Sequence, residues 1–135
     1  MSLCNLSFKI NLRIYYEDTD AGGVVYHSKY LNFAERARAE FFRNLSLEQT
    51  YIKKKYDIQF VVKNLSVNYL FSCKLDDQIC LVTDLENINR AKICFRHIFY
   101  KDEKEISKLQ VTVCCITNTG KVARMPKSLY HKIIN

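Results

Sequence analysis

The sequence predicts an α+β fold in which one long helix packs into the concave face of a curved antiparallel sheet of about five strands. Alternating apolar and polar residues at 8–16 predict a strand, and a helical period follows over residues 28–44. Four more strand-like segments then succeed one another with short turns between them. Short turns join antiparallel neighbours, and a sheet that wraps a helix buries the apolar face of both.

The long helix is indicated by apolar residues that recur at helical spacing. Tyr30, Ala34, Ala37 and Phe41 fall on one face, charged residues fill much of the other, and Ser28 stands where an N-cap is expected. Residues 47–57 favour a short helix or an irregular connection. The four later strands are expected at residues 58–73, 78–88, 91–100 and 106–118, before a basic, less regular tail that is compatible with a short terminal helix.

Length and composition indicate a single domain spanning residues 1–135. The 135 residues are 48% hydrophobic, which suits a protein with a buried core. No apolar run approaches the ~18 residues of a membrane span. The first residues lack the pattern of a signal peptide, so a cytoplasmic location is expected.

The six cysteines form no C-x-x-C pair and have no histidine at zinc spacing. Most of them lie in apolar stretches, where a reduced cysteine acts as a small hydrophobic residue. Free thiols in a reducing compartment are therefore predicted. Cys114 and Cys115 are neighbours on a predicted strand and should point to opposite faces.

The net charge of +7 and the pI of about 9.1 favour an anionic ligand or simply a soluble surface. Nucleic acid, anionic lipid and phosphate-bearing cofactors all carry the right charge. No basic and aromatic motif accompanies the charge, so we expect no nucleic-acid partner.

The loop before the long helix combines a carboxylate with features of an oxyanion site. Gly22 and Gly23 permit a tight turn beside Asp20, and they precede a helix N-terminus with free N–H groups and a positive dipole. A carboxylate as base or nucleophile and N–H donors for the tetrahedral oxygen are the two parts that acyl hydrolysis needs. Ordinary turn and capping chemistry would give the same residues.

The remaining polar residues receive simpler interpretations. We expect Asp18 to bond loop N–H groups and Glu17 to face solvent. His27 is either a polar residue of the cap region or a ligand or acid–base contact, whereas His97 is expected to be structural and His131 solvated. Three dispersed histidines do not favour a metal site, and no serine nucleophile elbow or nucleotide-binding glycine loop is present.

The stretch "YYEDTDAGGVVYHSKYLNFAERARAEFF", residues 15–42, closely resembles the signature of the 4-hydroxybenzoyl-CoA-thioesterase-like hotdog proteins. It is most similar to the YbgC subgroup, the acyl-CoA thioesterases associated with the Tol–Pal envelope system. The motif Y-x-D-T-D-x-x-G-V-V-Y-H-x-x-Y matches throughout residues 16–30. The likeness continues more loosely through residues 60–77 and into "MPKSL" near the C-terminus.

This resemblance implies a hotdog fold and a site formed between two subunits, in a dimer or a dimer of dimers (a homotetramer). Asp20 would be the catalytic carboxylate, as base or nucleophile. A backbone N–H near His27 would polarise the thioester carbonyl, and the His27 side chain would line the site. The implied substrate-binding residues are Gly22, Gly23, Val24, Val25, Tyr26, Tyr30, Glu35 and Arg90.

The implied substrate is acyl-CoA, hydrolysed to free acid and CoA without a metal or cofactor. The phosphates of CoA suit the basic charge, with candidates at Arg90, Lys92, Lys121, Arg124 and Lys127. Acidic acyl carrier protein would suit the same surface. The alternative is a non-catalytic module that binds acyl-CoA or acyl carrier protein and is linked to phospholipid or envelope machinery.

The chain departs from the family pattern at two places after the second strand begins. Ser72 and Cys73 replace a frequent Pro-Ala, and Asn68 replaces an acid. Both departures could alter the pocket and the subunit contact.

Overall fold

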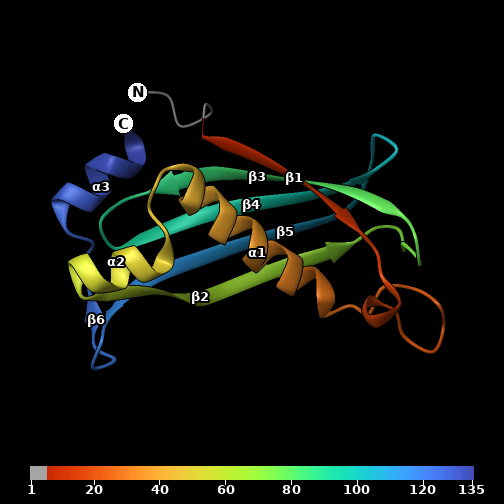
Figure 1. The fold of residues 1–135 in the computed structure, drawn as a ribbon, viewed down its shortest axis with the longest axis horizontal. Helices are drawn as coiled ribbons and strands as arrows, with labels where there is room; N and C mark the ends of the chain where they lie inside the picture. The colour runs from red at the N-terminus through yellow and green to blue at the C-terminus, as the bar shows by residue number, and fades with distance from the viewer. Residues whose placement is uncertain (1–5) are drawn as a thin grey trace.

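The computed structural model describes residues 6–135 (Figure 1). Its elements in chain order are β1 (Ser7–Arg13), the 3₁₀ turn η2 (Tyr16–Asp18), α1 (Lys29–Asn44), α2 (Gln49–Tyr56), β2 (Ile58–Tyr69), β3 (Gln78–Ile88), β4 (Lys92–Lys101), β5 (Lys104–Thr117), β6 (Val122–Ala123) and α3 (Lys127–Ile134).

The strands form one antiparallel sheet in the order β1-β3-β4-β5-β2, and the two-residue β6 pairs with β5. The strands β3, β4 and β5 follow one another as a meander, whereas β2 reaches the far edge beside β5. Irregular register between Val62 and Asn64 in β2 and between Leu85 and Asn87 in β3 adds bending to the sheet. Helix α1 crosses one face of the sheet, as Figure 1 shows.

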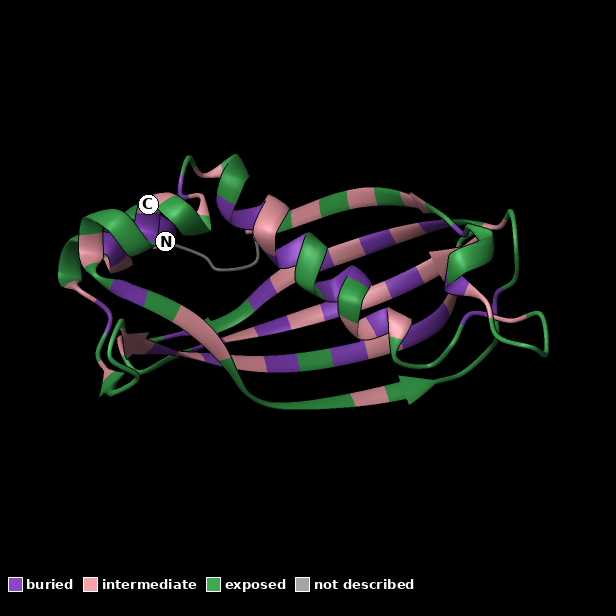
Figure 2. Ribbon diagram, turned by 60° about the horizontal axis from the view of Figure 1, so that its bottom comes forward, coloured by how far each residue is buried: buried purple, intermediate pink, exposed green. Residues whose placement is uncertain are grey.

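The core lies between α1 and the sheet. Buried residues alternate with half-buried ones along β3, β4 and much of β5, so one face of the sheet is apolar (Figure 2). The small side chains of Ala34 and Ala37, both 0% exposed, let α1 approach this face closely. Phe41 packs edge-on against Phe95 of β4 at 5.3 Å between ring centroids. These contacts fix the position of α1 and therefore of the loop before it.

The predicted helix-and-sheet arrangement is confirmed, and β3 has the expected bounds. Besides the long helix α1, the chain forms two short helices, α2 and α3, in the two segments where the sequence allowed one. The first strand ends at Arg13 rather than at residue 16, since a 3₁₀ turn follows. Ser28 does occupy the N-cap position of α1, but its side chain makes no capping hydrogen bond and its backbone is already helical.

Cysteines 73, 80, 94, 114 and 115 are free thiols, while Cys4 lies outside the described residues. Cys115 is buried and Cys114 is half-buried, as expected for neighbours on opposite faces of a strand. Between residues 6 and 135, no helix has the length and apolar character needed to cross a membrane.

Candidate functional site

The loop that joins β1 to α1 closes on itself around Asp20. Thr19 and Val25 form an isolated antiparallel bridge, and the Asp20 N–H donates to the Val24 carbonyl at 2.9 Å. The Gly23 N–H donates back to the Asp20 carbonyl at 3.0 Å. Gly23 has a φ of +82°, which side chains other than hydrogen rarely permit. The predicted tight turn is therefore present, and its positive φ explains why position 23 is a glycine.

The Asp20 side chain is exposed at the tip of this loop. Its Oδ1 accepts the Gly22 N–H at 2.8 Å, an Asx-type turn that orients the carboxylate. A Cβ at Gly22 would come within 3.2 Å of this same oxygen, so any side chain there crowds the carboxylate. Among the described residues Oδ2 has no hydrogen-bond partner, so it can meet a substrate or a water molecule.

Asp18 holds the loop, as the sequence predicted. It is 4% exposed, and its Oδ2 accepts the Tyr15 N–H at 2.9 Å. Its Oδ1 lies 3.8 Å from Nζ of Lys29, in the first turn of α1, and its carbonyl accepts the Tyr26 N–H. Glu17 is exposed, also as expected. The two neighbouring acids thus take different roles, because one carboxylate is buried among donors and the other is not.

The start of α1 offers backbone donors. The Val25 N–H donates to the Cys73 carbonyl and the Lys29 N–H to the Tyr26 carbonyl. Within residues 6–135 the N–H groups of His27 and Ser28 have no acceptor. The Tyr69 hydroxyl, at the end of β2, donates to the His27 carbonyl at 2.6 Å and fixes this peptide. Two free N–H groups at a helix N-terminus can hold a developing oxyanion.

A cavity of about 240 Å³ lies beside these donors, between the start of α1 and the end of β2. It is mainly apolar and aromatic, and its lining residues are Val25, His27, Tyr30, Tyr69, Leu70, Phe71 and Ser72. The sequence predicted three of these residues, Val25, His27 and Tyr30, as site residues. The departure from the family pattern at Ser72 therefore falls in the wall of this cavity.

Tyr30 is a neutral wall of the cavity and has no titrating role at physiological pH. Its ring is buried, and its hydroxyl lies 3.2 Å from Sγ of Cys73. Burial, followed by the contact with Cys73, strongly raises the pKa of Tyr30. Burial likewise raises the pKa of the Cys73 thiol. Cys73 therefore anchors Tyr30 in its protonated form and presents no thiolate.

The other predicted site residues lie outside the cavity wall. Gly22, Gly23 and Val24 belong to the loop, where Val24 also bridges to Lys74. The Tyr26 ring is exposed and lies 4.4 Å from the His27 ring. Glu35 is exposed on α1, two turns from its start.

Arg90 lies away from this loop within one protomer. It follows β3, at the end of the sheet opposite the start of α1 (Figure 1). Its Nε donates to the Met125 carbonyl at 2.7 Å, and the Met125 N–H donates back to the Arg90 carbonyl. Arg90 thus ties the C-terminal segment to the turn between β3 and β4.

Sequence reasoning missed the contribution of the end of β2. Tyr69, Leu70 and Phe71 line the cavity and are 44%, 52% and 51% exposed. These are three large apolar residues in succession at the end of a strand, where the alternation of apolar and polar residues stops. One face of the sheet cannot bury all three, so the sequence does carry a signal of exposed apolar side chains here. The contact with His27 spans 42 positions and could not be read from local pattern.

Neither of the other two histidines reaches the cavity. His131 is exposed, as expected. His97 is 0% exposed, with Nε2 3.2 Å from Nη1 of Arg38 and Nδ1 2.8 Å from Oγ1 of Thr83. Burial, followed by the nearby Arg38 charge, lowers the pKa of His97 to about 3. The expected structural role of His97 agrees with this buried, neutral state. No three His, Cys, Asp or Glu side chains gather into a possible metal site in the described part of the chain.

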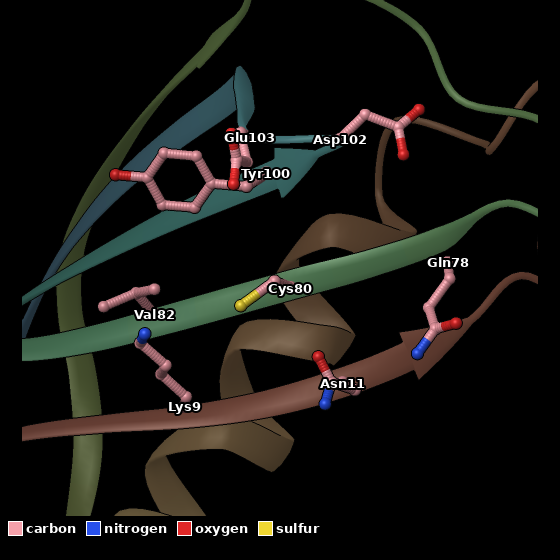
Figure 3. A pocket seen from close by; sticks show the side chains of 8 residues that line it. All are labelled: Lys9, Asn11, Gln78, Cys80, Val82, Tyr100, Asp102 and Glu103. Atoms are coloured by element: carbon pink, nitrogen blue, oxygen red, sulfur yellow. The ribbon is translucent and has the colours of Figure 1, made fainter.

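A larger hollow of about 620 Å³ lies on the sheet face turned away from α1 (Figure 3). Residues of β1, β3 and β4, including Asn11, Cys80 and Tyr100, line it together with the β4–β5 turn. It contains none of the predicted site residues. The smaller cavity is the candidate site because it adjoins the free N–H groups.

Comparison with known proteins identifies the family of the chain. Residues 15–133 match the model of the thioesterase-like superfamily. The chain is 41% identical over 109 residues to the acyl-CoA thioesterase YbgC of Haemophilus influenzae, covering 81% of this chain and 80% of that protein. It is 34% identical over 124 residues to the acyl-CoA thioester hydrolase YbgC of Escherichia coli, covering 90% and 92%.

The fold has close counterparts among solved structures. A probable thioesterase from Bartonella henselae superposes with a TM-score of 0.84 at 28% identity, over 89% of this chain and 99% of that one. The chain belongs to the thioesterase-like superfamily and has its hotdog fold. Within the family it groups with the YbgC proteins, as its motif indicated.

Proposed function

We propose that this protein is an acyl-CoA thioesterase, which hydrolyses the thioester bond of acyl-CoA to a free acid and CoA. The main observation that supports the proposal is the arrangement of polar groups in the loop of residues 19–28. Among residues 6–135, this loop presents a carboxylate oxygen without a hydrogen-bond partner at Asp20 and two backbone N–H groups without an acceptor at the start of α1. The names of the YbgC relatives support the substrate class.

The chemistry needs only these groups and water. With Asp20 as base, the carboxylate takes a proton from water while the hydroxide oxygen bonds to the thioester carbon. The N–H groups of His27 and Ser28 stabilise the oxyanion. The C–S bond then breaks, and the CoA thiolate receives the proton. With Asp20 as nucleophile, a carboxylate oxygen bonds to the thioester carbon, the C–S bond breaks and CoA leaves, and water then cleaves the acyl-aspartyl anhydride. If water attacks the aspartyl carbonyl of the anhydride, ¹⁸O from solvent enters Asp20 during a single turnover, whereas the base route leaves Asp20 unlabelled.

The complete site is proposed to form in a dimer through β2. β2 is a 12-residue edge strand, and edge strands with exposed apolar residues favour pairing with another chain. Antiparallel pairing of two β2 strands about a two-fold axis would put the end of the sheet that carries Arg90 beside the partner's Asp20 loop. Arg90 could then meet the phosphates of CoA held by the other protomer. Two such dimers would give the tetramer.

The basic surface also suits acidic acyl carrier protein as a second thioester donor. We place the protein in the cytoplasm, where CoA thioesters are available and the free thiols at positions 73, 80, 94, 114 and 115 would stay reduced.

The test is thiol release from a panel of short, long and aromatic acyl-CoAs by the wild type and by Asp20→Asn. We expect kcat/KM to fall ~10²-fold or more in Asp20→Asn, because a positioned base or nucleophile is lost. Asp76→Asn, an exposed acid in the turn before β3, is the matched control and should keep full activity. Binding of CoA thioesters without turnover by the wild type would refute the enzyme and favour a binding module.

A further inference from the structure

The surface formed by α2 and α3 brings two lysines onto one pair of aromatic rings. Tyr51 and Tyr56 of α2 are nearly perpendicular, with ring centroids 6.4 Å apart. Nζ of Lys55 lies 5.8 Å from each centroid. Nζ of Lys132, from α3, lies 5.7 Å from the Tyr51 centroid and 6.0 Å from that of Tyr56. Two ammonium groups, 77 positions apart in the sequence, therefore meet over the same two rings.

This cluster has no anionic partner within residues 6–135. The ion pairs there involve Lys29, Arg43, Arg96 and Lys101, and neither Lys55 nor Lys132 contacts a carboxylate. Two like charges repel, and interaction with the ring faces offsets only part of that repulsion. The nearby lysines of α2, at positions 53 and 54, add to the positive potential. The positive charge of the cluster therefore favours the binding of an anion.

The two tyrosine hydroxyls add polar groups to the charge. Lys132 Nζ donates to the Tyr51 hydroxyl at 3.4 Å, which leaves the Tyr51 hydrogen free to donate elsewhere. Within residues 6–135 the Tyr56 hydroxyl is shielded from water and makes no well-formed hydrogen bond, but it lies near the Lys132 ammonium and, with Tyr51, raises the pKa of that lysine. A buried hydroxyl without a well-formed hydrogen bond is destabilising, and a ligand oxygen that reaches it would satisfy it. The lysines, chiefly Lys55, also lower the pKa of Tyr51.

We propose that Lys55, Lys132, Tyr51 and Tyr56 form a binding site for a phosphate group. A phosphate monoester carries close to two negative charges at neutral pH, which matches the two ammonium groups, and its oxygens can accept from both lysines and both hydroxyls. The site lies at the end of the molecule away from the Asp20 loop (Figure 1). Its phosphate can belong to a soluble ester or to a phospholipid headgroup, since both present the same chemistry.

The experiment is a titration of the ¹⁵N-labelled full-length protein with inorganic phosphate, followed by amide chemical shifts. The test variant is Lys55→Gln with Lys132→Gln. The matched control, Lys9→Gln with Lys108→Gln, removes the same charge from β1 and β5 of the sheet and leaves α2, α3 and the aromatic cluster intact. We expect shifts centred on α2 and α3 in the wild type, a Kd at least ~10-fold weaker in the test variant, and less than ~2-fold weaker in the control. Equal weakening in both variants, or no shifts at α2 and α3, would overturn the site.

A second variant tests the proposed site if the double substitution disturbs folding. Tyr56→Phe removes only the hydroxyl and should weaken phosphate binding ~3–10-fold, the effect of one lost hydrogen bond. Unchanged affinity would remove Tyr56 from the site.

Vesicles distinguish the two sources of phosphate. If the source is lipid, cosedimentation with phosphatidylcholine vesicles should require added phosphatidic acid and should be lost in the Lys55 and Lys132 variant. If the source is soluble, inorganic phosphate should bind while both kinds of vesicle fail to sediment the protein.

Discussion

The hydrogen bond between Tyr69 and His27 acts on a single peptide group of the candidate site. Tyr69 donates to the carbonyl of His27, and the N–H of that same peptide belongs to Ser28, which finds no acceptor in the described part of the chain. A peptide whose oxygen accepts a hydrogen bond becomes a better donor at its nitrogen, because the group is polarised. Burial raises the pKa of Tyr69, so the hydroxyl keeps its proton at neutral pH. Tyr69 should therefore be a positioning residue for the oxyanion donors.

We predict that Tyr69→Phe lowers kcat ~5–20-fold with little change in KM, because about one hydrogen bond of support is lost in the transition state. Steady-state thiol release measures both constants. Tyr100→Phe, which alters a hydroxyl on the opposite face of the sheet, is the control and should behave like the wild type. A change in KM alone would mean that Tyr69 only shapes the cavity.

At the scale of elements, a buried polar contact fixes α1 on the sheet. Arg38 of α1 can only donate, so Nε2 of His97 must accept and Nδ1 must carry the proton that goes to Thr83. The contact therefore joins α1 to β4 and β3 through a neutral imidazole. Burial lowers the pKa of Arg38 as well, while the charge of Glu35 opposes that shift. A second positive charge at His97 would face Arg38 in the core.

This contact predicts a pH-dependent stability. The pKa of His97 is 6.5 when unperturbed and about 3 in the folded protein, so below pH 6.5 the unfolded chain binds a proton that the folded chain does not. The contribution of neutral His97 is complete above pH 6.5 and is lost as the pH falls toward 3. Between pH 7 and pH 5 this costs about 2 kcal/mol of unfolding free energy, measurable by urea denaturation.

The controls for this prediction are two histidine variants. His97→Gln should flatten the pH dependence between pH 7 and pH 5, whatever its effect at pH 7. His131→Gln, on the exposed side of α3, should leave the slope as it is in the wild type. An unchanged slope in His97→Gln would show that other groups cause the acid sensitivity.

The bounds of an element were predictable where a local pattern repeats along it. They were less predictable where the burial of apolar residues depends on what packs against them in the fold. The bounds of β3 agree with the sequence because its alternation matches a half-buried strand. The first strand was predicted three residues too long, since the apolar pair Tyr15 and Tyr16 is exposed. In the site, Asp20 and His27 were located by their motif. The contact of Tyr69 with His27 was not, because it depends on how β2 returns to the helix.

At the scale of the whole molecule, β2 is an edge strand that carries exposed apolar side chains. Register with buried Val113 and Val111 places Val62 and Leu65 on the side that faces α1. Yet these two side chains are 46% and 40% exposed, because β2 lies at the edge of the sheet. The strand thus combines unpaired backbone groups with apolar side chains, and a second copy of the chain would cover both.

We therefore predict that Leu65→Lys converts the protein to a monomer and lowers thioesterase activity at least ~10-fold, because a charge would be buried without a partner at the β2–β2 contact. Light scattering after gel filtration measures the mass, and thiol release measures the activity on the same fractions. Val122→Lys is the matched control. It adds the same charge at an apolar residue that is 83% exposed on β6, and it should change neither quantity. A Leu65→Lys protein that remains dimeric would exclude the β2 edge as the subunit contact. A fully active monomer would mean that one protomer holds the complete site, and that Arg90, at the far end of the sheet, is not needed for the reaction.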